Sequence, residues 1–222
     1  MKKAELAKYI DHTLLGPSAS KEQVKKLCQE AIQANVATVC VNPCHAALAK
    51  DYLVDSDVLL CVVVGFPHGM SLPESKAFEA QKAIAVGANE IDMVINVAAL
   101  KEGDFETVSE DVGAVVAMAR KAPSHVDVKV ILETALLTDE EKVAGAVLVK
   151  SAGADYVKTS TGFGPGGATL EDVSLLRKTV GPKMGVKAAG GIRDAEAAVA
   201  MIKAGATRIG ASRTLEILAG AE

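Results

Sequence analysis

The sequence of 222 residues contains no tryptophan, and only 3% of its residues are aromatic. Half of the residues are hydrophobic. The core must therefore consist mainly of alanine, valine, isoleucine and leucine, which is typical of a parallel sheet covered by helices. No apolar run approaches the length of about 18 residues that a membrane span needs, and residues 1–13 lack the apolar core of a signal peptide. We therefore expect a soluble, cytoplasmic protein.

The charges show no strong bias and no block of one sign. The formal net charge is −4, with acidic and basic residues mixed along the chain, so nucleic acid and anionic membranes are not expected as main partners. Four cysteines lie in the first third of the chain, and the Cys40/Cys44 spacing lacks the second half of a zinc site. We expect reduced thiols that pack as small apolar side chains, and no metal.

Strand-like and helix-like stretches alternate along the whole chain. Ser20 with Gln23 and Thr138 with Glu141 have the spacing of a capping box, and Thr169 is placed to cap a further helix. The predicted strands are 9–14, 37–42, 58–65, 90–96, 127–133, 154–160, 184–188 and 207–211. The predicted helices are 21–34, 43–52, 73–86, 105–120, 139–151, 170–180, 194–204 and 214–219.

Eight strand–helix units in one chain predict a (β/α)8 TIM barrel that forms a single domain over residues 1–222. A doubly wound open sheet is the alternative. It is disfavoured because the first strand is followed by neither a GxGxxG nor a Walker A pattern.

Charged and polar side chains fall at the carboxyl ends of the predicted strands, where such barrels carry their sites. Three lysines and two aspartates are too many charges for an inert interior. Alternation places Asp92, Val94 and Asn96 on one side of their strand, and Lys129, Ile131 and Glu133 on one side of the next. The full set is Asp11, His12, Thr13, Cys40, Asn42, Asp92, Asn96, Lys129, Glu133, Lys158, Thr159 and Lys187.

Lys158 is the candidate nucleophile. Between Val157 and Thr159 on a buried strand, its amine must be desolvated or paired. Desolvation disfavours an ammonium group, and a second ammonium on the next strand, Lys187, favours a neutral amine further. Asp92 could then carry protons for chemistry through an imine. The alternative is a structural ion pair.

Glycine-rich segments follow the last three predicted strands. Residues 162–167 follow one strand, Gly190 and Gly191 follow the next, and Gly210-Ala211-Ser212 follows the last. Because glycine lets backbone amides approach an anion, and because these loops often hold phosphate in such barrels, they predict a phosphate site. Arg193 either adds a charged contact or is a surface residue at the start of a helix.

Three motifs carry a family resemblance. VKTSTGF (157–163), VKAAGGIR (186–193) and EIDMVIN (90–96) resemble the signatures of the 2-deoxyribose-5-phosphate aldolases, and matching segments occur in order along essentially the whole chain. The resemblance implies a class I aldolase without metal or cofactor. Such an enzyme cleaves 2-deoxy-D-ribose 5-phosphate reversibly to acetaldehyde and D-glyceraldehyde 3-phosphate in deoxyribonucleotide catabolism. It also implies a homodimer or a higher homo-oligomer.

The resemblance also implies roles for individual residues. Lys158 is expected to form the Schiff base, Lys187 to act as the second lysine and Asp92 to move protons. The expected phosphate and substrate contacts are Gly162, Gly190, Gly191, Arg193, Gly210, Ser212, Asp11 and Lys129. Two features depart from the family pattern: the chain ends without a tail tyrosine, and Arg213 replaces a small hydroxyl residue. Another phosphate-binding barrel lyase or isomerase, or an inactive barrel that serves as a binding module, remains the alternative.

Overall fold

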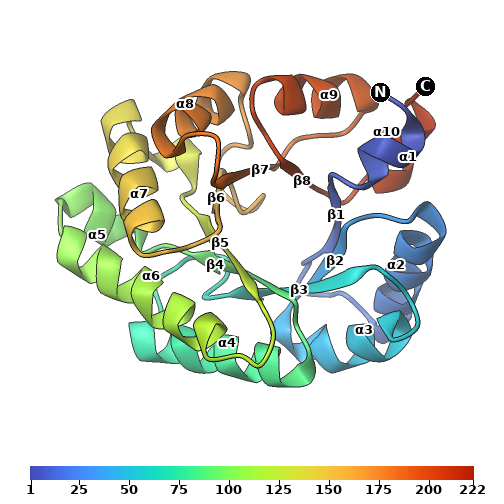
Figure 1. Ribbon diagram of the computed structural model, residues 1–222, viewed down its shortest axis with the longest axis horizontal. Helices are drawn as coiled ribbons and strands as arrows, with labels where there is room; N and C mark the ends of the chain where they lie inside the picture. The colour runs from blue at the N-terminus through green and yellow to red at the C-terminus, as the bar shows by residue number, and fades with distance from the viewer.

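The computed structural model describes all 222 residues and contains a closed barrel of eight parallel strands in the order β1 to β8. Helices surround the strands (Figure 1). Pairing of β1 with β8 excludes an open sheet and confirms the predicted (β/α)8 architecture. The strands are β1 (Ile10–Leu14), β2 (Thr38–Val41), β3 (Leu59–Val64), β4 (Glu90–Val94), β5 (Asp127–Ile131), β6 (Tyr156–Lys158), β7 (Gly185–Ala189) and β8 (Arg208–Ala211).

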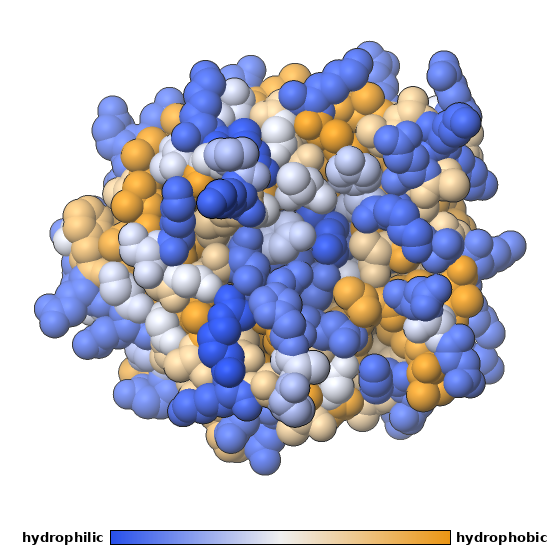
Figure 2. Space-filling model, viewed as in Figure 1, coloured by the Kyte–Doolittle hydropathy of each residue, from blue (hydrophilic) through white to orange (hydrophobic).

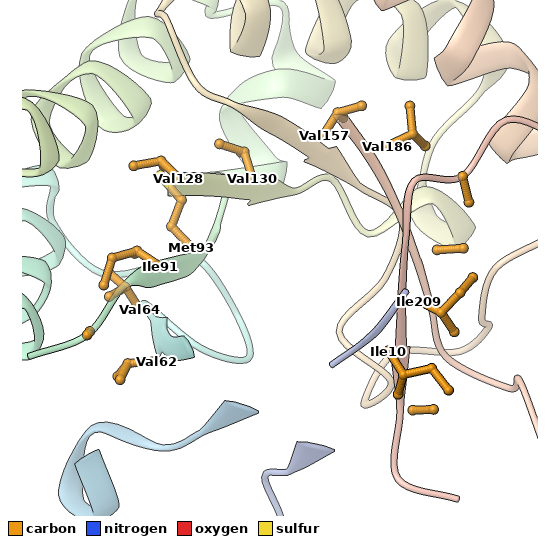
Figure 3. Close-up of a cluster of buried hydrophobic side chains, with 14 of the residues drawn as sticks. Ile10, Val62, Val64, Ile91, Met93, Val128, Val130, Val157, Val186 and Ile209 are labelled. Carbon is orange, nitrogen blue, oxygen red and sulfur yellow. The ribbon is translucent and has the colours of Figure 1, made fainter. Parts of the chain in front are cut away.

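Alternation along the strands separates an apolar outer layer from a polar interior. The outward side chains belong to one large buried cluster. Figure 3 shows Ile91, Val128 and Val186 among those on the outer side of the strands, toward the helices. Each strand residue between two such positions points into the barrel, and this set includes Asp92, Lys129 and other buried charges. The apolar layer therefore holds the barrel together, while the interior is free to carry chemistry.

The helices pack against this apolar layer. The predicted capping boxes are present: the Ser20 hydroxyl accepts a hydrogen bond from the Gln23 amide, and the Thr138 hydroxyl accepts one from the Glu141 amide. The Thr169 hydroxyl caps its helix likewise. The helices are α1 (Lys3–Ala7), α2 (Lys21–Ala34), α3 (Ala46–Leu53), α4 (Pro73–Val86), α5 (Val97–Glu102), α6 (Phe105–Arg120), α7 (Asp139–Ser151), α8 (Leu170–Val180), α9 (Ala195–Lys203) and α10 (Thr214–Ala219), with short 3-10 helices η1 (Pro43–His45) and η2 (Thr134–Leu136).

The predicted carboxyl ends of β4, β5 and β6 were wrong by two residues each, and so was the predicted start of β6. The Asn96 side chain accepts a hydrogen bond from the Ala99 amide and caps α5, a helix that the sequence did not predict. Glu133 has a φ of +58° and begins η2. Asn96 and Glu133 therefore do not continue the inward rows of Asp92 and Lys129. Helix α1 and the 3-10 helix η2 were also missed, whereas η1 and α3 together occupy the helix predicted over 43–52.

The two ends of the chain lie together on one side of the barrel (Figure 1). The Lys3 amide donates a hydrogen bond of 2.9 Å to the Glu222 carbonyl, so the tail lies against α1. None of the helices combines the length and the apolar character needed to cross a bilayer. In the space-filling view, hydrophilic residues gather over the middle of the molecule, while apolar patches are scattered between the helices around it (Figure 2).

Candidate active site

Seven charged side chains from six strands converge inside the barrel. Their alternating positions on the strands direct them inward, and the ladder registers bring neighbouring strands level: Asp92 pairs with Lys129, and Lys158 pairs with Lys187. The set contains Asp11 on β1, Glu90 and Asp92 on β4, Lys129 on β5, Lys158 on β6, Lys187 on β7 and Arg208 on β8. All but Arg208, which is half-buried, are buried.

Asp92 is the centre of this network. One of its oxygens, Oδ2, accepts hydrogen bonds from Lys158 Nζ at 2.6 Å and from Lys187 Nζ at 2.7 Å. The other, Oδ1, accepts from Lys129 Nζ at 2.9 Å and from the Cys61 thiol at 3.1 Å. Burial alone raises the pKa of a carboxyl, but the three ammonium groups outweigh it and hold the pKa of Asp92 well below its usual value. Asp92 is therefore a carboxylate.

Lys129 and Lys187 each donate hydrogen bonds to two carboxylates. Lys129 bonds Glu90 as well as Asp92, and Lys187 bonds Asp11 as well as Asp92. Burial lowers the pKa of a lysine, but here the carboxylates raise the pKa of both residues above the usual value. Both lysines therefore stay charged.

Arg208 also contacts two carboxylates, whereas Lys158 contacts only one. The Arg208 guanidinium lies 2.7 Å from an Asp11 oxygen and 3.1 Å from both Glu90 oxygens. Although burial opposes it, the two carboxylates raise the pKa of Arg208. Lys158 contacts a single carboxylate, Asp92, and shares the bonded oxygen with Lys187. Among the four interior cations, Lys158 has the fewest carboxylate contacts.

A cavity of about 400 Å³ opens above Lys158 at the carboxyl ends of β6, β7, β8 and β1. Its lining includes Lys158 but neither Lys129 nor Lys187, which lie beneath it. Six of the eight residues predicted to contact substrate or phosphate line the same cavity: Gly162, Gly190, Gly191, Arg193, Gly210 and Ser212. Asp11 and Lys129 do not line it, because both lie deeper in the barrel interior. Arg213 lines it as well, with its guanidinium 3.1 Å from Glu216. The structure thus brings Lys158 and the glycine loops together.

The glycine loops fit each other too closely for side chains. Gly190 has a φ of +91°, and a Cβ on Gly167 would lie 2.4 Å from the Gly190 carbonyl oxygen. The Ala168 amide donates a hydrogen bond of 3.0 Å to that same oxygen. The loops after β6 and β7 are therefore locked to one another beside the cavity, with glycine required at the contact.

Some residues from the predicted strand ends lie elsewhere. His12 faces outward, with Nε2 3.1 Å from Glu30, and the Asn42 amide donates to the Leu15 carbonyl at 3.1 Å. Cys40 is buried beside Cys61 within the barrel. Thr13 lines the cavity, and the buried Thr159 hydroxyl donates to the Ala189 carbonyl at 3.1 Å.

Two functional candidates, Glu90 and Arg208, were not predicted, whereas Glu133 was expected among the residues at the strand ends. Glu90 and Arg208 complete the interior network, and alternation would have found Glu90, which lies two residues before Asp92 on the same side of β4. Glu133 is buried after β5, and its carboxylate accepts hydrogen bonds from the Thr161 amide and hydroxyl. Thr161 lines the cavity, so Glu133 fixes the first part of the loop after β6.

One cluster inside the barrel has metal-ligating atoms. Cys40, Cys61 and Asp92 bring one ligand atom each within 4.8 Å of one another. Both Asp92 oxygens already accept bonds from ammonium groups. A metal ion would have to displace these cations, so the arrangement favours chemistry through an amine.

A buried amine that opens into a glycine-edged cavity at the carboxyl ends of the strands defines a (β/α)8 barrel enzyme with a lysine-centred site. Residues 6–221 match the model of the DeoC/LacD family aldolases. The chain belongs to this family.

Curated relatives and solved structures agree with this assignment. A deoxyribose-phosphate aldolase of Brevibacillus brevis is 58% identical over 215 residues, which cover 97% of this chain and 96% of the relative. The crystal structure of a putative deoxyribose-phosphate aldolase from Coccidioides immitis superposes with a TM-score of 0.94 at 43% identity, covering 99% of this chain and 86% of that one. The structure of the deoxyribose phosphate aldolase of Aeropyrum pernix, described as a tetramer, superposes with a TM-score of 0.92 at 36% identity. The match covers 98% of this chain and 91% of that one.

Proposed function

We propose that the protein cleaves 2-deoxy-D-ribose 5-phosphate reversibly to acetaldehyde and D-glyceraldehyde 3-phosphate through an imine on Lys158. The observation that carries this proposal is the position of Lys158. It is the one interior lysine that lines the cavity, and the one interior cation that contacts a single carboxylate. Family membership supports the aldol reaction, and the names of the relatives support the substrate.

The chemistry begins at the Lys158 amine. In its neutral form, Nζ attacks the C1 aldehyde of the open-chain sugar. The hydroxyl that forms takes up a proton and leaves as water, which gives a protonated imine. This cation withdraws electrons, so the C2–C3 bond breaks as the C3 hydroxyl loses its proton. C3 then becomes the aldehyde carbon of D-glyceraldehyde 3-phosphate. The remaining enamine takes a proton at C2, and water releases acetaldehyde from the lysine.

Asp92 is placed to move these protons, with Lys187 beside it. Asp92 Oδ2 accepts hydrogen bonds from both Lys158 and Lys187, so a proton leaving the Lys158 amine has a direct path to Asp92. The lowered pKa of Asp92 makes it a temporary carrier, because a carboxyl of that kind gives its proton up again readily. Lys187, held by Asp11 and Asp92, supplies fixed positive charge beside the reacting carbons.

The glycine loops would hold the substrate phosphate at the other side of the cavity. Backbone amides of Gly190, Gly191 and Gly210 can approach an anion, and Ser212 and Arg193 can add a hydroxyl and a cation. Asp11 and Lys129 would act from below by holding Lys187 and Asp92. This chemistry requires no metal or organic cofactor, because the amine itself provides the electron-withdrawing group.

We also propose that the protein forms a homo-oligomer in the cytoplasm. The relative from Aeropyrum pernix is described as a tetramer, which supports self-association. Light scattering on the purified chain tests the assembly.

Reductive trapping tests the proposed reaction. Incubation with 2-deoxyribose 5-phosphate and borohydride should leave a stable mass adduct, and peptide mapping should place it on Lys158. Lys158→Met should abolish the adduct. Lys76→Met is the matched control, since Lys76 is equally buried but lies between helices outside the barrel interior, and it should leave the adduct intact. Adduct-free wild-type protein would contradict the imine mechanism and favour a barrel isomerase.

A further inference from the structure

We propose that Arg208 is a positioning residue that leaves the barrel interior with one positive charge too many, so that Lys158 is the group that releases a proton. This inference rests on the proposed imine chemistry at Lys158. It assigns a role in that chemistry to Arg208, and with it to Glu90, neither of which reaches the cavity.

Arg208 lies at the opposite end of the interior from the cavity. It is the first residue of β8, two residues before Gly210, which lines the cavity. Its guanidinium contacts Asp11 and Glu90 and lies 5.6 Å from the centre of the Tyr156 ring. Substrate held above Lys158 cannot touch it. Any effect of Arg208 on the reaction must pass through the carboxylates that it contacts.

The interior contains four cationic side chains and three carboxylates. If Lys158 releases its proton, three cations face three carboxylates, and each remaining cation still contacts two of them. A guanidinium cannot release its proton in a protein, and Lys129 and Lys187 are each held by two carboxylates. Lys158 is therefore the one cation whose neutralisation balances the interior.

Three other titratable groups face the same interior. The Cys61 thiol on β3 donates to Asp92, so it is protonated, and burial raises its pKa. Cys40 on β2 lies beside Cys61, whose hydrogen bond lowers the Cys40 pKa. The Tyr156 hydroxyl on β6 lies 3.5 Å from the Arg208 guanidinium. Cys40→Ser and Cys61→Ser should leave the pH dependence close to that of the wild type if the seven charged groups set it.

The charge balance predicts shifts of opposite sign. Arg208→Gln removes the excess charge, so the amine keeps its proton longer, and the pH midpoint of adduct formation should rise by on the order of one unit. Glu90→Gln increases the excess, so the midpoint should fall by a similar amount. The double variant Glu90→Gln/Arg208→Gln leaves three lysines and two carboxylates, again an excess of one. Its midpoint should return toward that of the wild type.

The experiment measures the rate of reductive trapping with acetaldehyde and cyanoborohydride as a function of pH. Arg208→Lys, which keeps the charge, should keep the wild-type midpoint, and circular dichroism checks that each variant is folded. Lys76→Met is again the control, because it should lower the stability of the fold without shifting the pH midpoint of adduct formation.

The outcomes separate this inference from the proposed function. Wild-type protein that forms no adduct contradicts the proposed function itself. If the wild type forms the adduct, a purely structural role for Arg208 and Glu90 predicts unchanged midpoints and a double variant worse than either single one. That result overturns the inference. If Arg208→Gln fails to fold, a Glu90→Gln midpoint equal to that of the wild type overturns it as well.

Discussion

The molecule contains two kinds of buried charge, and they differ in how they are compensated. Inside the barrel, each carboxylate contacts at least two cations, and together they form a continuous network. Between α4 and α6, Lys76 and Asp111 form an isolated pair at 2.7 Å. The Oδ1 atom of Asp111 is buried with no hydrogen-bond partner. The carboxylates of Asp92 in the network and of Asp111 in the pair are similarly buried, but their pKa values shift in opposite directions.

The pKa directions show this difference. Burial raises the pKa of Asp111, and the single cation beside it does not reverse that. Burial also lowers the pKa of Lys76, despite its partner. Inside the barrel, several cations around Asp92 do reverse the effect of burial. In these pKa shifts, the single partner in the pair therefore does not outweigh burial, whereas the several partners in the network do.

The isolated pair has a structural use. Lys76 Nζ donates to the Val94 carbonyl at 2.9 Å, and Asp111 Oδ2 accepts from the Asn96 amide at 3.0 Å. These two contacts hold the turn that ends β4, two residues beyond Asp92. The pair thus fixes the end of the strand that carries the centre of the network, without contributing charge to it.

The largest effect is expected from Asp92→Asn. Three lysines lose their shared carboxylate, so proton transfer fails and the charges repel. We expect a loss of kcat on the order of 10³-fold and a decrease in the free energy of unfolding of about 3–5 kcal/mol. A coupled assay for acetaldehyde and urea denaturation measure the two. Asp111→Asn, the matched carboxyl outside the barrel, should keep most of the activity of the folded protein; an equal loss of kcat there would remove the distinction between the two regions.

Lys76→Met should affect stability and spare catalysis. It leaves Asp111 buried without a cation, which typically costs about 3–5 kcal/mol. Urea denaturation should show that loss, while kcat per folded molecule stays within about twofold. The turn after β4 would loosen, so a small rise in KM is compatible with this prediction.

A double variant separates charge from packing at the same place. Lys76→Met/Asp111→Leu removes both charges and the unpartnered oxygen, and it should recover most of the stability lost in Lys76→Met. If the double variant is less stable than the single one, the pair is itself a net source of stability, and the comparison with the network does not hold.

The sequence predicted the barrel because local signals agreed along the chain. Apolar positions with a period of two marked the strands, and hydroxyl caps such as Ser20 and Thr138 marked the helix starts. It extended β4 and β5 too far because Asn96 and Glu133 keep the alternation. What ends β4 is a contact with Asp111 on α6, fifteen residues later, and local patterns do not contain such contacts.

The site was predicted less completely than the fold. The polar residues at the predicted strand ends included Lys158, Lys187 and Asp92. In the structure, both lysines donate hydrogen bonds to Asp92 Oδ2. Arg208 and Glu90 were missed, because they begin their strands and lie deeper in the barrel. The catalytic and phosphate-binding roles stay predictions until tested by substitution.

The charge network inside the barrel should make the stability of the fold sensitive to acid. Burial raises the pKa of Asp11 and of Asp92, but the cations around them hold both below the usual value. A lowered pKa stabilises the fold above the unfolded value, near about 4, and this stability is lost as the pH falls toward the folded value. We expect the free energy of unfolding, from urea denaturation, to decrease by about 2–3 kcal/mol as the pH falls below about 4.

Asp111 has a raised pKa, so its contribution has the opposite sign. The variant Lys76→Met/Asp111→Leu should therefore lose at least as much stability in acid as the wild type; a flat profile in that variant would place the acid-sensitive charges between α4 and α6 instead of inside the barrel.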